Sequence, residues 1–178
     1  KEGTYEIESE RRGYALELAV DFVRMEYTRH RFWEKDDTPV VPLKSQTLED
    51  VIETWPQGKI NVRIGDYMFR PHQKWTITAV PDGGGYLGGP YYKIVIEGTN
   101  RALAATADAE VVTVPEFTGA PEQLWRIDQL TDGTYRIMPK EVPGTDKELV
   151  LASVGDSTPS LGEFDMNSDN SKWNFRDH

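Results

Sequence analysis

The 178-residue sequence contains no cysteine. Disulfides, thiolate metal sites and cysteine nucleophiles are therefore excluded. No apolar stretch approaches the roughly 20 residues that a membrane-spanning helix needs, so we predict no membrane span. The formal net charge is −10. A field of that sign repels phosphate, which argues against nucleic acids and anionic membranes as partners.

These absences leave the cellular compartment open. A cysteine-free chain is compatible with the cytosol and does not exclude secretion. The chain begins at Lys1 rather than Met, so we expect an N-terminus that is processed or trimmed, and a removed leader would be invisible. At roughly 150 residues per domain, the length predicts a single domain with a substantial core.

Signatures of catalysis are also missing. The sequence has no Gly-x-Ser-x-Gly elbow, His-Glu-x-x-His helix, phosphate loop or calcium-binding loop. The glycine-rich stretch "DGGGYLGG" (82–89) precedes a predicted strand rather than a helix, and no two carboxylates are paired by the sequence for acid–base work. We therefore predict a protein that is not an enzyme and needs no metal or cofactor.

What the sequence does contain is a threefold repeat. The phrase formed by a polar residue, a spacer, a Trp and an apolar residue two places later occurs as "HQKWTI", "EQLWRI" and "NSKWNF". Its Trp residues are separated by 125 − 75 = 50 and 173 − 125 = 48 positions. Two further phrases recur in step, a Tyr-x-Ile opener and a segment of small residues and Leu. The openers lie at 3–7, 90–96 and 133–137, and the second segments at 12–19, 99–107 and 146–153.

Each repeat has the pattern of short antiparallel strands. Tyr92, Ile94 and Ile96 alternate with polar or smaller residues, and turn-forming residues bound the segment. About four strands per repeat give about twelve in all, in repeats spanning about 1–85, 86–130 and 131–178. A Trp at one fixed place in each repeat predicts three buried core residues. They are Trp75, Trp125 and Trp173.

On these phrases the sequence resembles the β-trefoil of the ricin B-type lectins. Gln73-Lys74-Trp75 and Gln123-Leu124-Trp125 carry the Gln-x-Trp phrase in full, whereas the third copy has Ser171 in the first place. The resemblance covers nearly the whole chain apart from one insertion. The lack of cysteine and the openers are also similar to the cysteine-free trefoils of mushrooms, which include lectins and the mycocypin protease inhibitors. The resemblance implies an all-β fold of three pseudo-symmetric four-stranded repeats.

The resemblance further implies how a sugar would be held. In such lectins an Asp on the second strand of a repeat accepts sugar hydroxyls, an aromatic ring covers the sugar face, and an Asn or Gln near the Trp phrase completes the site. The matching acceptor positions here hold Glu17, Ala104 and Val150. Repeats two and three therefore lack the carboxylate, and Glu17 is one methylene longer than Asp.

Repeat three nevertheless gathers the densest set of polar and aromatic residues, in "GEFDMNSDNSKW". We predict that a bound glycan would sit there, with Phe164 on the ring face, Asp165 accepting hydroxyl hydrogen bonds and Asn167 or Asn170 donating. The alternative is that these residues only close a turn, because Asp and Asn favour tight turns. The further candidates are in repeat one: Glu17, Asp66 and Tyr67, with Phe69 in the same stretch as the last two.

Repeat one is longer than the others. From opener Tyr to phrase Trp it spans 75 − 5 = 70 positions, against 125 − 92 = 33 and 173 − 135 = 38. The excess lies within about 20–60, where alternation over 23–28 predicts an extra strand and Thr47 is placed to cap a short helix. Long insertions of this kind are usually functional or disordered, and the aromatic content argues against disorder. The stretch "RHRFW" (29–33) is either a contact patch for an acidic or sugar partner or a strand end.

We therefore predict a non-enzymatic binding module whose partner is a glycan or glycoprotein. The alternative is a trefoil protease inhibitor that inserts an exposed loop into a protease cleft. A third possibility is a structural or storage protein without a small ligand.

Overall fold

The computed structural model describes residues 2–11, 14–20, 52, 55–86, 89–154, 158–165 and 167–177. Contacts divide the chain into two compact units, Lys1–Ala19 with Gly58–His178, and Val20–Gln57. In the second unit Trp55 is buried, and its amide donates a hydrogen bond of 3.0 Å to the carbonyl of Ile52. The predicted extra strand, the helix start at Thr47 and the stretch 29–33 lie outside the described residues.

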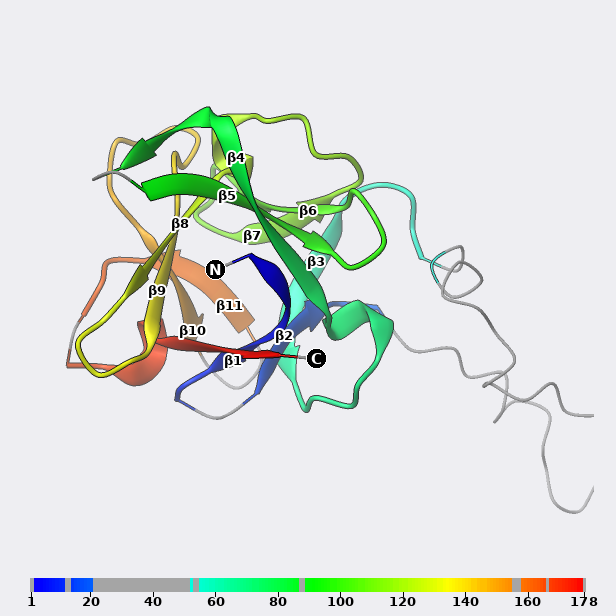
Figure 1. Cartoon of the computed structure of the whole chain (residues 1–178), viewed down its shortest axis with the longest axis horizontal. Coiled ribbons are helices and arrows are strands. Elements are labelled where there is room, and N and C mark those ends of the chain that lie inside the picture. The colour runs from blue at the N-terminus through cyan, green and yellow to red at the C-terminus, as the bar shows by residue number, and fades with distance from the viewer. Residues whose placement is uncertain are drawn as a thin grey trace, which may run out of the picture. The chain divides into compact units, whose positions relative to one another are not determined.

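The larger unit is built from strands joined by turns and three short 3-10 helices (Figure 1). The described residues form twelve strands, as the repeat pattern predicted. The strands are β1 (Gly3–Ser9), β2 (Ala15–Leu18), β3 (Ile60–Gly65), β4 (Trp75–Tyr86), β5 (Gly89–Ile96), β6 (Ala102–Ala105), β7 (Val111–Val114), β8 (Trp125–Gln129), β9 (Tyr135–Pro139), β10 (Val150–Val154), β11 (Thr158–Gly162) and β12 (Trp173–Asp177). The 3-10 helices are η2 (Pro71–Gln73), η3 (Pro121–Gln123) and η4 (Asp169–Ser171).

Six strands close into a barrel. They follow the order β12-β9-β8-β5-β4-β1, and β12 also pairs with β1, so that no edge is left open. The other six form the hairpins β2–β3, β6–β7 and β10–β11, one in each repeat. A six-stranded barrel with three hairpins is the β-trefoil, which confirms the predicted fold class.

The barrel strands pair in the same way in all three repeats. Within a repeat, the opener Tyr lies opposite the phrase Trp. Each Trp also lies opposite a residue at the end of the next repeat's opener strand. Each repeat is therefore paired with the next one, and the three repeats close a ring. The pairs within a repeat are Tyr5↔Trp75, Tyr92↔Trp125 and Tyr135↔Trp173, and those between repeats are Trp75↔Ile96, Trp125↔Pro139 and Trp173↔Ser9.

The three phrase Trp residues are the anchors of the core. Each is 0% exposed, which confirms the prediction made from their spacing. Each indole nitrogen donates a 2.9 Å hydrogen bond to the carbonyl of a fully buried Leu on the second strand of its own repeat. The acceptors are Leu16, Leu103 and Leu151. The bond satisfies the only donor of the indole, so the ring can be buried without an unpaired polar atom.

The Gln of the phrase has a separate role, because it fastens the loop that precedes it. Gln73 Oε1 accepts hydrogen bonds from the amides of Met68 and Arg70 at 2.8 and 3.3 Å. Gln123 Oε1 accepts one from the Thr118 amide at 2.7 Å. The Gln-x-Trp phrase therefore repeats because one residue ties the loop and the other ties the hairpin to the barrel.

Candidate functional site

The loop of repeat three, described at residues 163–165 and 167–168, brings its predicted residues together. Asp165 and Asn167 are exposed, and Phe164 is half-buried. Asp165 Oδ1 accepts the Asn167 amide at 2.9 Å, and the Asp165 carbonyl accepts the Ser168 amide at 3.1 Å. Ser168 Oγ in turn caps η4 by accepting the Asn170 amide at 3.1 Å. These short polar side chains stabilise the turn in the repeat that has Ser171 in place of the loop-fastening Gln.

The ring of Phe164 is engaged with a cation. The guanidinium of Arg136 lies over it, with Cζ 5.1 Å from the ring centroid. Arg136 also donates to Asp128 Oδ2 at 2.8 Å, and Asp128 accepts a second 2.8 Å bond from Arg126. One face of the Phe164 ring is therefore covered by a surface ion-pair network.

The second strands of repeats two and three carry no carboxylate at the acceptor position. The Trp hydrogen bonds fix the equivalence, because Leu16, Leu103 and Leu151 are the matched acceptors. The residue after each is Glu17, Ala104 and Ala152. In repeat three the counterpart of Glu17 is thus Ala152, and the sequence-based match to Val150 was wrong by two positions.

Glu17 itself is only 5% exposed and is surrounded by polar partners. It accepts hydrogen bonds from Arg63 Nε at 2.5 Å and Gln73 Nε2 at 2.6 Å, and His72 Nε2 lies 3.8 Å from Oε1. Gly65 leaves room for the carboxylate, since a Cβ there would be 3.1 Å from Oε1. Burial lowers the pKa of His72, although the charge of Glu17 opposes that shift. The carboxylate thus holds Arg63, whose side chain is 39% exposed.

Arg63 and His72 were missed as site residues by the sequence reasoning. Arg63 lies directly opposite Glu17 in the β2–β3 register, so correct pairing of the hairpin would have found it. His72 precedes the Gln of the phrase and is buried. The sequence contains both residues at positions close to the repeated phrases. Assigning them to the site requires knowing the pairing of the strands.

The loop of repeat one, residues 66–70, is connected to the buried Glu17 carboxylate through the side chain of Gln73. Besides fastening Met68 and Arg70, Gln73 donates to the carbonyl of Asp66 at 2.7 Å and to Glu17. Phe69 is 71% exposed, and its φ of 59° lies in the left-handed region that a bulky residue rarely adopts. The ring of Tyr67 lies beside that of Phe69, with centroids 4.7 Å apart. The loop therefore presents an aromatic tip in a fixed conformation.

Acidic groups lie near Tyr67. Burial raises the pKa of Tyr67 to about 12, and the charges of Glu6 and Glu97 add to the shift. The hydroxyl of Tyr67 therefore stays protonated at physiological pH and keeps its donor. Burial raises the pKa of Glu6 to about 7, with Glu8 adding through its charge and a hydrogen bond, while Arg176 opposes the shift.

The raised pKa of Glu6 predicts how stability depends on pH. Because the folded protein favours the protonated acid, its contribution is fully present below the ordinary pKa of about 4.5 and is lost as pH rises through about 7. Glu6→Gln should remove this loss, so the variant should gain stability relative to the wild type between pH 5 and 8 in urea unfolding. The exposed Glu110→Gln is the control, and identical pH profiles for wild type and Glu6→Gln would contradict the assignment.

Comparison with known proteins identifies the relatives of this fold. Residues 71–158 match the model of the ricin-type beta-trefoil lectin domain-like family. The protein is a β-trefoil that resembles the ricin B-type lectins. No curated protein matches the sequence.

Solved structures that resemble this trefoil have distant sequences. A designed threefold-symmetric protein, ThreeFoil, is 19% identical with a TM-score of 0.63, over 98% of this chain and 99% of the other. The Polyporus squamosus lectin, solved with a human-type influenza-binding epitope, is 15% identical with a TM-score of 0.62, over 98% and 48%. A mosquitocidal holotoxin is 14% identical with a TM-score of 0.66, and the trefoil spans 17% of its length. At these identities the likeness shows the fold alone.

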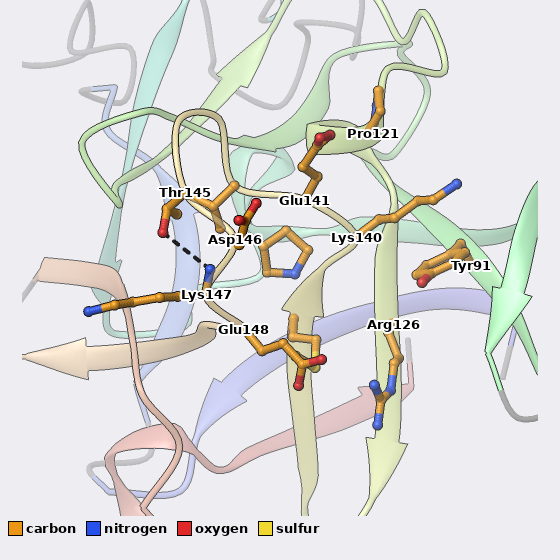
Figure 2. Close-up of a pocket in the computed structure, with 12 residues that line it drawn as sticks. Tyr91, Pro121, Arg126, Lys140, Glu141, Thr145, Asp146, Lys147 and Glu148 are labelled. Carbon is orange, nitrogen blue, oxygen red and sulfur yellow. Dashed lines mark hydrogen bonds between the residues drawn. The ribbon is translucent and has the colours of Figure 1, made fainter.

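Repeats two and three of the trefoil together form a cleft, which Figure 2 shows. The long strand connection of repeat three makes up much of its lining. This β9–β10 connection runs over residues 140–149, whereas β1–β2 and β5–β6 are joined by 10–14 and 97–101. The cleft holds about 420 Å³, with Tyr91 and Lys140 on one side and residues 145–147 on the other. Three basic and three acidic residues line it, so their charges compensate. The basic ones are Arg126, Lys140 and Lys147, and the acidic ones Glu141, Asp146 and Glu148.

Two other kinds of site are not found in the part of the chain that the structure describes. Within it, no three His, Cys, Asp or Glu side chains are grouped so that they could hold a metal ion. None of its helices has the length and apolar character needed to cross a membrane.

Proposed function

We propose that this β-trefoil is a non-enzymatic carbohydrate-binding protein that uses the loop of repeat one, residues 66–70. The observation that carries the proposal is Phe69, a ring 71% exposed in a left-handed backbone conformation. Exposure and backbone strain both cost free energy, and such residues cluster at functional sites. An aromatic face of this kind covers the apolar side of a pyranose.

Polar groups of this loop and of the preceding strand β3 can pair with sugar hydroxyls. Asp66 is exposed and offers carboxylate acceptors. Arg63 offers guanidinium donors from a side chain that Glu17 holds in place, and Tyr67 keeps its hydroxyl proton. In this arrangement Glu17 is a positioning residue, because its oxygens already accept bonds from Arg63 and Gln73.

Repeat one is favoured over repeat three because the candidate residues of the two loops differ in their exposure and in their contacts. In repeat three, Asp165 closes a turn and Phe164 lies under Arg136. In repeat one, the aromatic tip is exposed and the fastening is done by Gln73 rather than by the candidate residues. Binding through Phe164 and Asp165 stays a prediction that the same experiment tests.

The fold adds support. The Polyporus squamosus lectin, about half of which resembles this trefoil, was solved bound to a human-type influenza-binding epitope. The family model that matches residues 71–158 describes lectin-like domains.

A glycan array followed by titration of any hit tests the site. Phe69→Ala should weaken binding by about ten- to a hundredfold, the value expected when a ring's burial of about 1.5–3 kcal/mol is lost. Phe164→Ala and Asp165→Ala are matched controls on the equivalent loop and should bind as the wild type does. Loss of affinity in these controls with an unchanged Phe69→Ala would move the site to repeat three, and an array without hits would contradict carbohydrate binding.

Protease inhibition is the second candidate function, and the same loop, residues 66–70, supports it. Met68 and Phe69 are the two large apolar side chains that are exposed among those the structure describes, and Gln73 holds the loop in one conformation. A fixed, protruding apolar loop is the form that enters a protease cleft. An inhibition panel with wild type and Phe69→Ala separates the two functions, because inhibition without any glycan hit would favour the inhibitor.

A further inference from the structure

Strands of the barrel line a second cavity, which shares no lining residue with the loop of repeat one. It holds about 630 Å³ and is lined by residues of β1, β4, β8, β9 and β12, with Glu2 just before β1. That volume lies within the roughly 300–1,000 Å³ of small-molecule sites. We call it the barrel mouth.

Its apolar lining comes from the repeated phrase. The apolar residue two places after each Trp is Ile77, Ile127 and Phe175, and all three line the barrel mouth. Residues two apart on a strand point to the same side, so each repeat contributes one side chain to the cavity at the end of the Trp-anchored core. Repeat three supplies an aromatic ring where the other two supply Ile.

Two Tyr residues extend this ring into an aromatic wall. Tyr5 and Tyr135 each meet Phe175 edge to face, with centroids 5.6 and 5.0 Å apart and interplanar angles of 65° and 70°. Both are opener Tyr residues, and both line the cavity. The aromatic side of the barrel mouth is therefore the side where repeats three and one meet.

The charges of the barrel mouth have one sign. Its lining includes two carboxylates, Glu2 and Asp177, and no Lys, Arg or His among the described residues that line it. Asp177 lies opposite Tyr5 in the β1–β12 register, which places a carboxylate at the aromatic wall. Burial and, next, the charge of Asp177 raise the pKa of Tyr5, which agrees with a negative potential at this end of the barrel.

From this combination we infer that the barrel mouth binds a small organic cation with an apolar or aromatic body, such as a quaternary ammonium compound. The rings of Tyr5, Tyr135 and Phe175 offer the cation aromatic faces, which attract a charge that lies over them. The carboxylates neutralise the charge, and the Ile residues pack against the apolar body. A neutral or anionic molecule of the same shape gains no such electrostatic attraction.

Calorimetric titration with benzyltrimethylammonium tests this inference, with benzenesulfonate and benzyl alcohol as matched anionic and neutral probes. The cation should bind saturably and the two other probes should not. Phe175→Leu and Asp177→Asn should each weaken cation binding by about tenfold, the order expected for a desolvated cation–ring or cation–carboxylate contact. Asp177 is exposed, so its variant should fold even where the ring variant is destabilised.

Phe117→Leu and Asp108→Asn serve as controls, since both residues lie outside the barrel mouth. They should bind the cation as the wild type does. The inference is overturned if the cation does not bind saturably, if benzenesulfonate binds equally well, or if Asp177→Asn and the controls behave alike. Phe69→Ala should retain cation binding, so failure here and failure of the carbohydrate proposal are distinguishable.

Discussion

Replacing Trp125 by Ala is expected to lower the free energy of unfolding by about 3–5 kcal/mol, the range for truncating a fully buried Trp. The side chain is 0% exposed, so its removal leaves a cavity that close-packed neighbours fill only in part. The change also removes the 2.9 Å bond to the Leu103 carbonyl and leaves that buried acceptor without its indole partner. Urea unfolding followed by circular dichroism measures the loss.

The other two phrase Trp residues provide internal replicates. Trp75 and Trp173 make the same 2.9 Å bond to a Leu carbonyl and are equally buried, so Trp75→Ala and Trp173→Ala should cost similar amounts. Trp125→Phe removes the donor and a smaller part of the ring volume, and it should cost about 1–3 kcal/mol. A loss below about 1 kcal/mol for two of the three Ala variants would contradict their role as anchors.

Replacing Gln73 by Leu is expected to lower the free energy of unfolding by about 2–4 kcal/mol. Leu has a similar size but makes none of the four hydrogen bonds that Gln73 forms with the loop and with Glu17. Each bond contributes about 0.5–1.5 kcal/mol, and a buried polar group left without its partner costs more. Chemical unfolding measures the change, and limited proteolysis reports whether the loop at 66–70 has been released.

Gln123→Leu is the matched control in repeat two. Gln123 Oε1 accepts bonds only from the Thr118 amide and hydroxyl among those described, at 2.7 and 3.3 Å, so the expected loss is about 1–2 kcal/mol. The difference between the two variants isolates the bonds that are special to repeat one. Equal losses, with no change in proteolysis at residues 66–70, would show that Gln73 does not hold the loop.

The fold was predictable because its signals are local and repeated. The phrase Trp recurs at near-equal spacing, at positions 75, 125 and 173. A core position that is filled in the same way in three repeats produces a periodic residue in the sequence. The alternation of Tyr92, Ile94 and Ile96 follows from the two-residue period of a strand. Both signals depend on the chain alone, so they could be identified without knowing which strands pair.

The site was less predictable because it depends on pairing across strands. A shift of two residues keeps the alternation of a strand unchanged, so nothing in the sequence separated Val150 from Ala152 as the counterpart of Glu17. The cluster at Asp165 and Asn167 was equally ambiguous, since the same residue types bind sugars and close turns. Phe69 was identified only together with Asp66 and Tyr67, because neither its exposure nor its left-handed φ is encoded in a local sequence pattern.

The pairing of β1 with β12 bears on how the chain reaches its native state. Tyr5 lies opposite Asp177 and Ser9 opposite Trp173, so the contacts that complete the barrel join residues more than 160 positions apart. Bringing these residues together costs conformational entropy of the chain before the contacts between them stabilise the structure. This slows folding relative to proteins with local contacts. During synthesis, β1 can pair with β2 and β4, but its pairing with β12 waits until the last strand has left the ribosome. Ile7 and Tyr5, buried in the final barrel, lack the contacts of β12 for that time, and apolar surface exposed in this way favours aggregation and chaperone binding.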